Sequence, residues 1–363
     1  MEDTTFSDIL RYLKMPQNLD LETIVDTAIV KSREDGKMNA VSAFRLASKM
    51  TALGRADLHD KILMSVPTEY LTEWRVRKNY KRIPVGASFS ASMSQYRAFT
   101  NAVSQSIGIK RNRRLFQKTS GRKFALTNGF KVAEQYQVGE RIENISVKPG
   151  TILKPMHDSG SKGVFVFKAD GRIINLKTKQ EYSSFDQVKD EVKRQIDSGY
   201  LLSKRFLTEE LLEGHDGGVP NDLKFYTFYG EIGLALEGCR LGNEDKHCFY
   251  VDGKEKISGK YPDALFSGAG YPDNWNKIAS DLSKLVPLPF LRIDFFMTNK
   301  GLYVGEFTSA PGGYEKFNLE FDRMLGERFI NAQARLHTDM LNGKIFVEYQ
   351  KFLDSFETAG EEE

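Results

Sequence analysis

The sequence is short of the residues that define several common classes of protein. Two cysteines, Cys239 and Cys248, are too few and too badly spaced for a disulfide framework or a zinc site. Five scattered histidines argue against a histidine-based metal centre or catalytic triad, and neither a G-x-S-x-G nor an H-E-x-x-H motif occurs. No apolar stretch approaches the roughly 20 residues that a membrane span requires.

A large excess of charge is also missing. The 52 basic and 49 acidic residues give a net charge of +3, which argues neither for nor against nucleic acid, and we expect no specific nucleic-acid partner. The N-terminus, MEDTTFSDILRYL, carries acids where a signal peptide needs a basic start. We therefore expect a cytoplasmic protein with reduced thiols, and the length leaves room for two or three domains.

The pattern along the chain predicts a helical region before a mixed α/β region. Residues 1–80 carry apolar residues at helical spacing, with Gly36 and Gly54 placed where helices end. We expect these helices to form a cap or docking module, for a protein partner or a second copy of the chain. Segment 81–123 is expected to be a linker. Its basic stretch KRNRRLFQKTSGRK is interpreted as a solvent-exposed face, with phosphate or nucleic-acid binding as the alternative.

From about residue 124 the pattern alternates between strands and helices, in two halves at 124–206 and 207–320. C-terminal helices and an acidic tail follow at 321–363. The expected strands are 151–157, 163–170, 172–178, 200–207 and a hairpin at 224–242; the expected helices are 185–199, 275–286 and one or two within 319–343.

The stretch 289-PFLRIDFFMTNKGLYVGEFTSAPGG-313 predicts a hairpin whose apolar strands each carry one acid. A three-residue loop, Asn299 to Gly301, places Asp294 opposite Glu306 and Arg292 opposite Thr308. The same register pairs Phe296 with Val304 and Thr298 with Leu302, all on one face of the sheet.

Two opposed carboxylates on one face repel each other, so a positive group should offset them. Arg292 is one choice, and a divalent cation such as Mg²⁺, which takes oxygen ligands beside substrate phosphates, is the other. A purely structural Arg–Asp–Glu cluster is the alternative.

Two further stretches suggest a phosphate site. In 151-TILKPMHDSGSKGVFVFK-168, a Gly/Ser loop follows Lys154, and its amides and hydroxyls could close over phosphate oxygens. An ordinary hairpin loop with a surface lysine is the alternative. In 200–232, an apolar strand runs into the acids Glu209, Glu210 and Glu213 before Lys224, an order that suits an adenine edge, ribose hydroxyls and phosphate in turn.

These stretches together resemble the ATP-grasp superfamily, and within it the TupA-like group of teichuronic acid biosynthesis. The resemblance is carried by Lys154-Pro155 with its loop, by PNDLKFY at 220–226 and by RIDFF…GEFTSAPGG from Arg292 to Gly313, and it spans about 120–320. It implies an ATP-grasp fold of two α+β subdomains that grip a nucleotide. The small subdomain would hold the phosphate loop at 124–206, and the large one would hold the magnesium site at 207–320.

The resemblance also implies roles for individual residues. Catalytic roles fall to Arg292 and Lys224, and Mg²⁺ ligation falls to Asp294, Glu306 and Thr308. Residues 203–206 correspond to the adenine hinge, and Glu210 to the acid that binds ribose. Nucleotide contacts are assigned to Lys131, Lys154, Ser159, Gly160, Lys204, Phe206 and Glu210.

Two departures from the superfamily pattern concern the metal site and the hinge. Thr308 stands where many members have asparagine, and the stretch Ser203 to Phe206 lacks the usual hinge acid. The implied activity is an ATP-dependent carboxylate–amine ligase that works through an acyl phosphate and releases ADP and phosphate. Its substrate is expected to be a cell-surface polysaccharide precursor or a small metabolite. A kinase on the same fold and a non-catalytic nucleotide-binding module are the alternatives.

Overall fold

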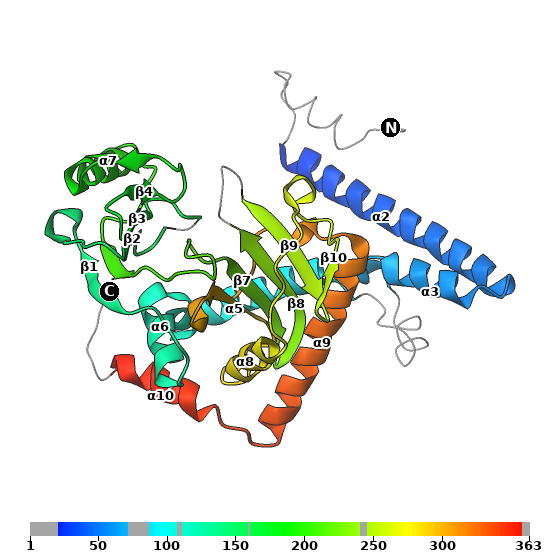
Figure 1. Cartoon of the computed structure of the whole chain (residues 1–363). Coiled ribbons are helices and arrows are strands. Elements are labelled where there is room, and N and C mark those ends of the chain that lie inside the picture. Colours follow the sequence, from blue (N-terminus) through cyan, green and yellow to red (C-terminus); the bar gives the residue numbers. More distant parts are fainter. Residues whose placement is uncertain (1–20, 72–86, 107–110, 159, 240–244, 358–363) are drawn as a thin grey trace. The chain divides into compact units, whose positions relative to one another are not determined.

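A computed structural model describes the chain except for residues 1–20, 72–86, 107–110, 159, 240–244 and 358–363 (Figure 1). The chain divides into two compact units, residues 1–88 and residues 89–363. The domain boundaries expected from the sequence stay a prediction. None of the helices in the described ranges is both long enough and apolar enough to cross a membrane.

The smaller unit is helical, with α2 (Leu21–Ala52), α3 (Ala56–Ser65) and the 3₁₀ turn η1 (Thr68–Tyr70). The expectation that Gly36 ends a helix is wrong, because α2 runs through it. Without a side chain, Gly36 lets the ring of Tyr70 approach, and an added Cβ would lie 2.0 Å from the Tyr70 hydroxyl oxygen. Gly54 does follow the end of α2, with a φ of 71° that suits glycine.

The larger unit contains two antiparallel six-stranded sheets and the helices that cover them. The first sheet has the order β1-β6-β2-β3-β4-β5 and the second β10-β9-β8-β7-β11-β12. First-sheet strands are β1 (Gln135–Glu140), β2 (Thr151–Pro155), β3 (Phe165–Phe167), β4 (Ile173–Asn175), β5 (Glu181–Tyr182) and β6 (Phe206–Glu210). Second-sheet strands are β7 (Asp222–Phe228), β8 (Glu231–Cys239), β9 (Lys246–Val251), β10 (Lys254–Lys256), β11 (Leu291–Thr298) and β12 (Gly301–Thr308).

Most helices of this unit lie where the apolar periodicity predicts them. The helices expected at 185–199 and 275–286 are α7 and α8; the range 319–343 holds the single helix α9, and α10 follows beyond it. The segment expected to be a linker contributes α5, which packs on α9. Their bounds are α5 (Phe89–Ser106), η2 (Arg111–Phe116), α6 (Lys118–Thr127), η3 (Ile142–Asn144), α7 (Phe185–Asp197), η4 (Pro262–Ala264), α8 (Asn274–Ser283), η5 (Tyr314–Lys316), α9 (Leu319–Leu341) and α10 (Val347–Glu357).

Helix α7 covers the first sheet, burying Val188 and Val192 against it (Figure 1). The strand expected at 200–207 is displaced, since β6 begins only at Phe206. The carboxylate of Asp158 accepts the backbone N–H groups of Leu202 and Ser203, at 3.2 and 2.9 Å. The N–H groups of Leu202 and Ser203 are therefore bonded to a side chain distant in sequence and not to a neighbouring strand, which apolar periodicity alone does not reveal.

The two faces of the second sheet bury different sets of side chains. One face carries Leu291, Ile293 and Phe295 and packs against α6, α8 and α10. The other carries an aromatic region, including Tyr226 and Phe228, that packs against α5 and α9. Beyond that aromatic region, the same face carries charged side chains and is open to a pocket.

The hairpin of β11 and β12 has the predicted pairing at its acids but not at its turn. Asp294 pairs with Glu306 and Arg292 with Thr308, as expected. The expected pairs Phe296–Val304 and Thr298–Leu302 are wrong; Phe296 faces Tyr303, and Thr298 faces Gly301 across a two-residue turn. A register shift beside Asp294, with Gly305 as the extra residue, compensates for the shorter turn.

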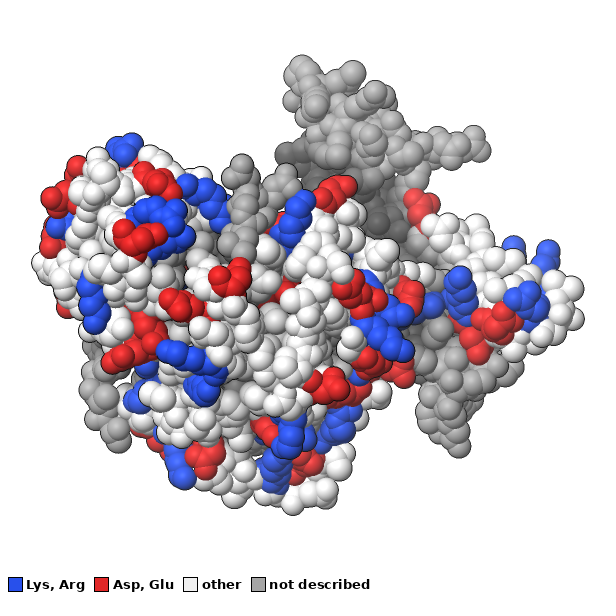
Figure 2. Space-filling model, in the orientation of Figure 1, with Lys and Arg blue, Asp and Glu red and all other residues white. Residues whose placement is uncertain are grey.

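On the face of the molecule that Figure 2 shows, the described Lys and Arg side chains are interspersed with Asp and Glu. This face therefore presents no broad basic field of the kind that a nucleic-acid backbone selects. Several Lys, Arg, Asp and Glu side chains instead line the pocket of the larger unit.

Candidate functional site

A pocket of about 600 Å³ lies between the two sheets of the larger unit. The first sheet contributes residues of β2 and β6, the second contributes β7, β11 and β12, and α6 adds Lys118 and Arg122. Side chains distant in sequence therefore meet at one place because both sheets turn a face toward the pocket.

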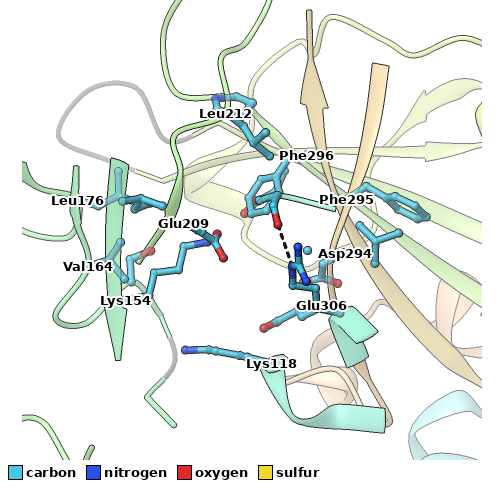
Figure 3. A pocket seen from close by; sticks show the side chains of 18 of the residues that line it. Lys118, Lys154, Val164, Leu176, Glu209, Leu212, Asp294, Phe295, Phe296 and Glu306 are labelled. Atoms are coloured by element: carbon cyan, nitrogen blue, oxygen red, sulfur yellow. Dashed lines mark hydrogen bonds and ion pairs between the residues drawn. The ribbon is translucent and has the colours of Figure 1, made fainter. Parts of the chain in front are cut away.

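One half of the pocket is apolar. Leu176, Leu212 and Phe296 lie toward one end in Figure 3, and Phe295 points away into the core. Phe296 comes from the second sheet, whereas most of the other apolar residues come from the first sheet and its loops. The apolar lining includes Ile152, Val164, Leu176, Leu207, Leu211, Leu212, Val219 and Phe296. Such a slot suits a flat apolar group between two walls.

The other half of the pocket is charged and centres on Asp294. Arg292 donates from Nε and Nη2 to the two carboxylate oxygens of Asp294, at 2.6 and 2.8 Å. Lys224 Nζ donates to the same carboxylate at 2.9 Å and lies 3.3 Å from Asp222. Burial acts to raise the pKa of Asp294, but Lys224 and Arg292 outweigh it and hold that pKa below its usual value.

Glu306 stands beside Asp294 with its side chain 45% exposed to the pocket. Its Oε1 lies 3.5 Å from Arg292 Nη2, which also donates to the Thr308 hydroxyl at 3.1 Å. The pKa of Glu306 is raised, first because the pocket walls limit its hydration and then because Asp294 is negative. The repulsion expected from the sequence is therefore present, and Arg292 offsets part of it.

Lys118 brings a further cation to the charged half from the first residue of α6. Its Nζ donates to the backbone carbonyls of Pro155 and Asp158, each at 2.7 Å, and so holds the start of the Gly/Ser loop. Burial and the neighbouring charge of Lys154 lower the pKa of Lys118. In Figure 3 it lies near Glu306, at the end of the pocket away from Leu212.

Lys154 reaches the pocket from β2 and forms an ion pair with Glu209 of β6. Its Nζ also lies 5.4 Å from the centre of the Phe296 ring. Lys154 therefore lies between the charged and the apolar half (Figure 3).

The structure brings eight of the predicted site residues together and leaves three of the described ones out. Lys131 donates to the carbonyl of Lys300 at 2.6 Å, outside the pocket lining. Lys204 is exposed and also outside the lining, and Phe206 is fully buried in the first-sheet core. Ser159 lies outside the described residues. The predicted residues that line the pocket are Lys154, Gly160, Glu210, Lys224, Arg292, Asp294, Glu306 and Thr308.

Several lining residues were missed by sequence reasoning. Lys118 and Arg122 belong to the basic stretch that was interpreted as an exposed face, and Glu209 was weighed only as one acid among three. Segment 209–212 lines the pocket where 203–206 was expected to do so. The signal for Lys118 was present in its basic stretch, but apolar periodicity does not tell which of its cations turns inward.

The residues present fit Mg²⁺. No group of three His, Cys, Asp or Glu side chains suited to a metal occurs in the described part of the chain. Mg²⁺ usually takes one or two carboxylates and completes its shell with water and substrate phosphates. Asp294 and Glu306 supply two such carboxylates, with the Thr308 hydroxyl beside them.

Residues 117–330 match the model of the TupA-like ATPgrasp family. The chain belongs to this family. The ATP-grasp fold predicted from the sequence is thereby confirmed, and the TupA-like ATP-grasp region contains every residue of the pocket. No curated protein matches the chain.

Solved structures of ATP-grasp proteins are similar to this TupA-like chain at low identity. The ATP-grasp ligase PsnB, complexed with a phosphomimetic variant of a minimal precursor, Mg and ADP, is 14% identical with a TM-score of 0.39, covering 74% of this chain and 76% of that one. D-alanine–D-alanine ligase from Bacillus anthracis is 12% identical with a TM-score of 0.39, covering 74% and 86%. The Helicobacter pylori ligase of that name is 16% identical with a TM-score of 0.34, covering 60% and 58%. Such values assign neither activity nor substrate to this chain.

Proposed function

We propose that this protein is an ATP-dependent carboxylate–amine ligase. The observation that supports it is a single pocket with an apolar slot at one end and, at the other, cations around the paired carboxylates Asp294 and Glu306. A nucleoside triphosphate has the matching division into a flat base and a charged phosphate chain. Membership of the TupA-like ATP-grasp family agrees with this ligand.

The nucleotide would lie with its base between the two sheets. Ile152, Val164 and Phe296 would flank the base, and the backbone of 209–212, with Glu210, would meet its edge and the ribose. Lys118 and Lys154 would hold the phosphates, with Gly160 in the loop above them. Lys118 takes the place that the resemblance gave to Lys131, because Lys131 lies outside the lining.

The transfer step would take place at the charged end. The carboxylate of the acyl substrate attacks the γ-phosphorus of ATP, the bond to ADP breaks, and an acyl phosphate forms; an amine then displaces phosphate. Mg²⁺, held by Asp294, Glu306 and Thr308, would neutralise charge on the phosphates. Arg292 and Lys224 would steady the transferred group, and no side-chain nucleophile is required.

A hydroxylamine assay tests the chemistry. The purified protein is incubated with Mg-ATP, hydroxylamine and a panel of carboxylic acids, and hydroxamate and ADP are measured. An acyl phosphate gives a hydroxamate that depends on the acid and disappears in Arg292→Ala. A stable phosphorylated product instead identifies a kinase, and ATP binding without turnover across the panel supports a non-catalytic module.

The remaining expectations stay predictions. An acceptor from a cell-surface polysaccharide precursor or a small metabolite rests on the family resemblance alone, as does the amine as nucleophile. A cytoplasmic location and a docking role for the N-terminal helices, toward a partner or a second copy, rest on the sequence.

A further inference from the structure

Lys260 is a buried cation that the proposed reaction does not use directly. Only 2% of its surface is exposed, and it lies in the segment before η4. Its ammonium donates to the carbonyl oxygen of Gly312 and lies 5.0 and 5.3 Å from the ring centres of Tyr261 and Phe317. Within the described parts of the chain, no carboxylate forms an ion pair with it. Burying a cation without a carboxylate opposes folding, so a role other than stability is indicated.

The hydrogen bond of Lys260 ends at the wall of the pocket. Gly312 lines the pocket and belongs to the Pro311–Gly313 loop, which follows β12 and its Glu306. Gly313 has a φ of 62°, and a Cβ there would lie 3.5 Å from Lys260 Cε, so the loop and the lysine are closely fitted. Because a planar peptide turns as one body, a hydrogen bond to the Gly312 carbonyl restrains the whole peptide that joins Gly312 to Gly313.

The backbone around Lys260 is anchored to the segment that follows this loop. Ser258 is fully buried; its Oγ accepts the N–H of Lys260 at 3.3 Å, and its carbonyl accepts the N–H of Asn318 at 2.8 Å. The Asn318 side chain caps α9 and also donates to the carbonyl of Ile257. A Cβ on Gly259 would lie 2.8 Å from the Asn318 backbone nitrogen, which shows how closely the two segments pack. Lys260 therefore extends from a rigid base.

We propose that Lys260 is a positioning residue for phosphoryl transfer, which holds the Pro311–Gly313 loop in the conformation that walls the charged end of the pocket. The role in transfer rests on the function proposed above, whereas the hold on the loop does not. Arg292 from β11, and Glu315 and Lys316 from η5, are the other charges that face Lys260. Burial first, and then repulsion from Arg292, lowers the pKa of Lys260 to about 8, so the ammonium becomes a weaker, neutral donor as the pH rises through that value.

Hydrogen exchange over residues 309–318 tests the hold on the loop. Wild type, Lys260→Met, Lys260→Arg and the control Lys256→Met, at an exposed position outside the measured segment, are compared at pH 7, with rates normalised to intrinsic exchange. We expect at least tenfold faster exchange of this segment in Lys260→Met only. In wild type the segment should loosen between pH 7 and 9, and Lys260→Arg should remove this pH dependence. Unchanged loop exchange in Lys260→Met, or faster exchange throughout the larger unit, overturns the proposal.

Two further measurements are needed. One distinguishes a positioning role of Lys260 from a role in folding, and the other distinguishes failure of this proposal from failure of the proposed function. Because Gly312 is exposed and water can replace the lost donor, Lys260→Met should melt at no lower temperature than wild type at pH 7. A lower melting temperature means a merely structural lysine. Mg-ADP affinity, measured by calorimetry, should stay within threefold of wild type, whereas kcat in the hydroxamate assay should fall and recover in Lys260→Arg. If wild type binds no Mg-ADP, the proposed function fails while the loop result stands.

Discussion

Asp294 is the side chain on which the charged half of the pocket converges. Two cations, Arg292 and Lys224, hold its carboxylate ionised despite its burial, while Glu306 beside it has a raised pKa. A metal ion bound by Asp294 must share its oxygens with these cations. Single residues therefore set both the charge and the geometry of the site.

Lys118 and Lys131 are two lysines that can be compared as phosphate ligands, because Lys118 lines the pocket and Lys131 does not. Lys118→Met should weaken Mg-ADP binding about 10- to 100-fold, since a hydrogen bond to a charged group contributes about 1.5–3 kcal/mol. Lys131→Met should change it by less than about twofold, because Lys131 bonds to Lys300 outside the pocket. Isothermal calorimetry of both variants decides. Equal losses, or a larger loss in Lys131→Met, would return the phosphate role to Lys131.

Phe296 tests the apolar half of the pocket. Phe296→Ala should weaken ATP binding about tenfold, because the base loses the ring and its buried contact area. The affinity for inorganic triphosphate, which has no base, should be unchanged when it is measured by displacement of a fluorescent nucleotide. Tyr303→Ala is the control. Tyr303, on β12, lies opposite Phe296 of β11 but does not line the pocket. Equal effects on ATP and triphosphate would contradict this placement of the base.

Sequence reasoning identified the acids and arginine of the hairpin because alternation along a strand fixes which side chains share a face. Lys204 and Phe206 are assigned to nucleotide contacts by the family resemblance alone; in the structure Lys204 is exposed outside the pocket lining, and Phe206 is buried in the core. Lys118 was passed over because its position depends on α6 beginning at that residue and turning it toward Pro155.

In the hairpin of β11 and β12, the predicted pairing of Asp294 with Glu306 is correct although the predicted three-residue loop is wrong. A three-residue loop without a bulge and a two-residue turn with a bulge at Gly305 bring the same residues opposite each other beyond the bulge. Nothing in the local pattern distinguishes the two, although they differ in whether Val304 or Tyr303 faces Phe296.

The two hydrogen bonds accepted by Asp158 lead us to predict that this carboxylate stabilises the segment just before β6. An asparagine there can accept one of the two N–H groups but presents an amide to the other, so Asp158→Asn should destabilise the protein by about 1–3 kcal/mol. Urea unfolding measures the change, and Asp197→Asn, at an exposed position at the end of α7, should have little effect. An unchanged unfolding midpoint in Asp158→Asn would contradict this stabilising role.

Over the whole molecule, the proposed nucleotide site is contained in the larger of the two units. Every pocket residue lies between Lys118 and Gly312, and the family match covers 117–330. The sequence predicted the helical character of the first unit from periodicity. It could not predict that α5 joins the larger unit, because that depends on Phe89 packing among aromatic rings such as Phe228 and Phe290, far along the chain.

Removing the first unit should leave nucleotide binding intact. A protein of residues 89–363 is expected to unfold cooperatively and to bind Mg-ADP within about threefold of the full chain, because no pocket residue is removed. Calorimetry measures the affinity, and light scattering compares the association state. A folded truncated protein with unchanged association contradicts the docking role of the helices; loss of Mg-ADP binding contradicts a self-contained site.

A metal–nucleotide site built on Asp294 and Glu306 should bind ATP in a Mg²⁺-dependent way, and thermal shift with ATP, with and without Mg²⁺, measures this. Wild type, Glu306→Gln and the exposed control Glu315→Gln are compared. Ligand at about 100 times its Kd should stabilise the wild type by about 2.7 kcal/mol. We expect a Mg²⁺-dependent shift in wild type and Glu315→Gln that is lost in Glu306→Gln. A shift that survives in Glu306→Gln, or that is absent from wild type, would contradict such a site.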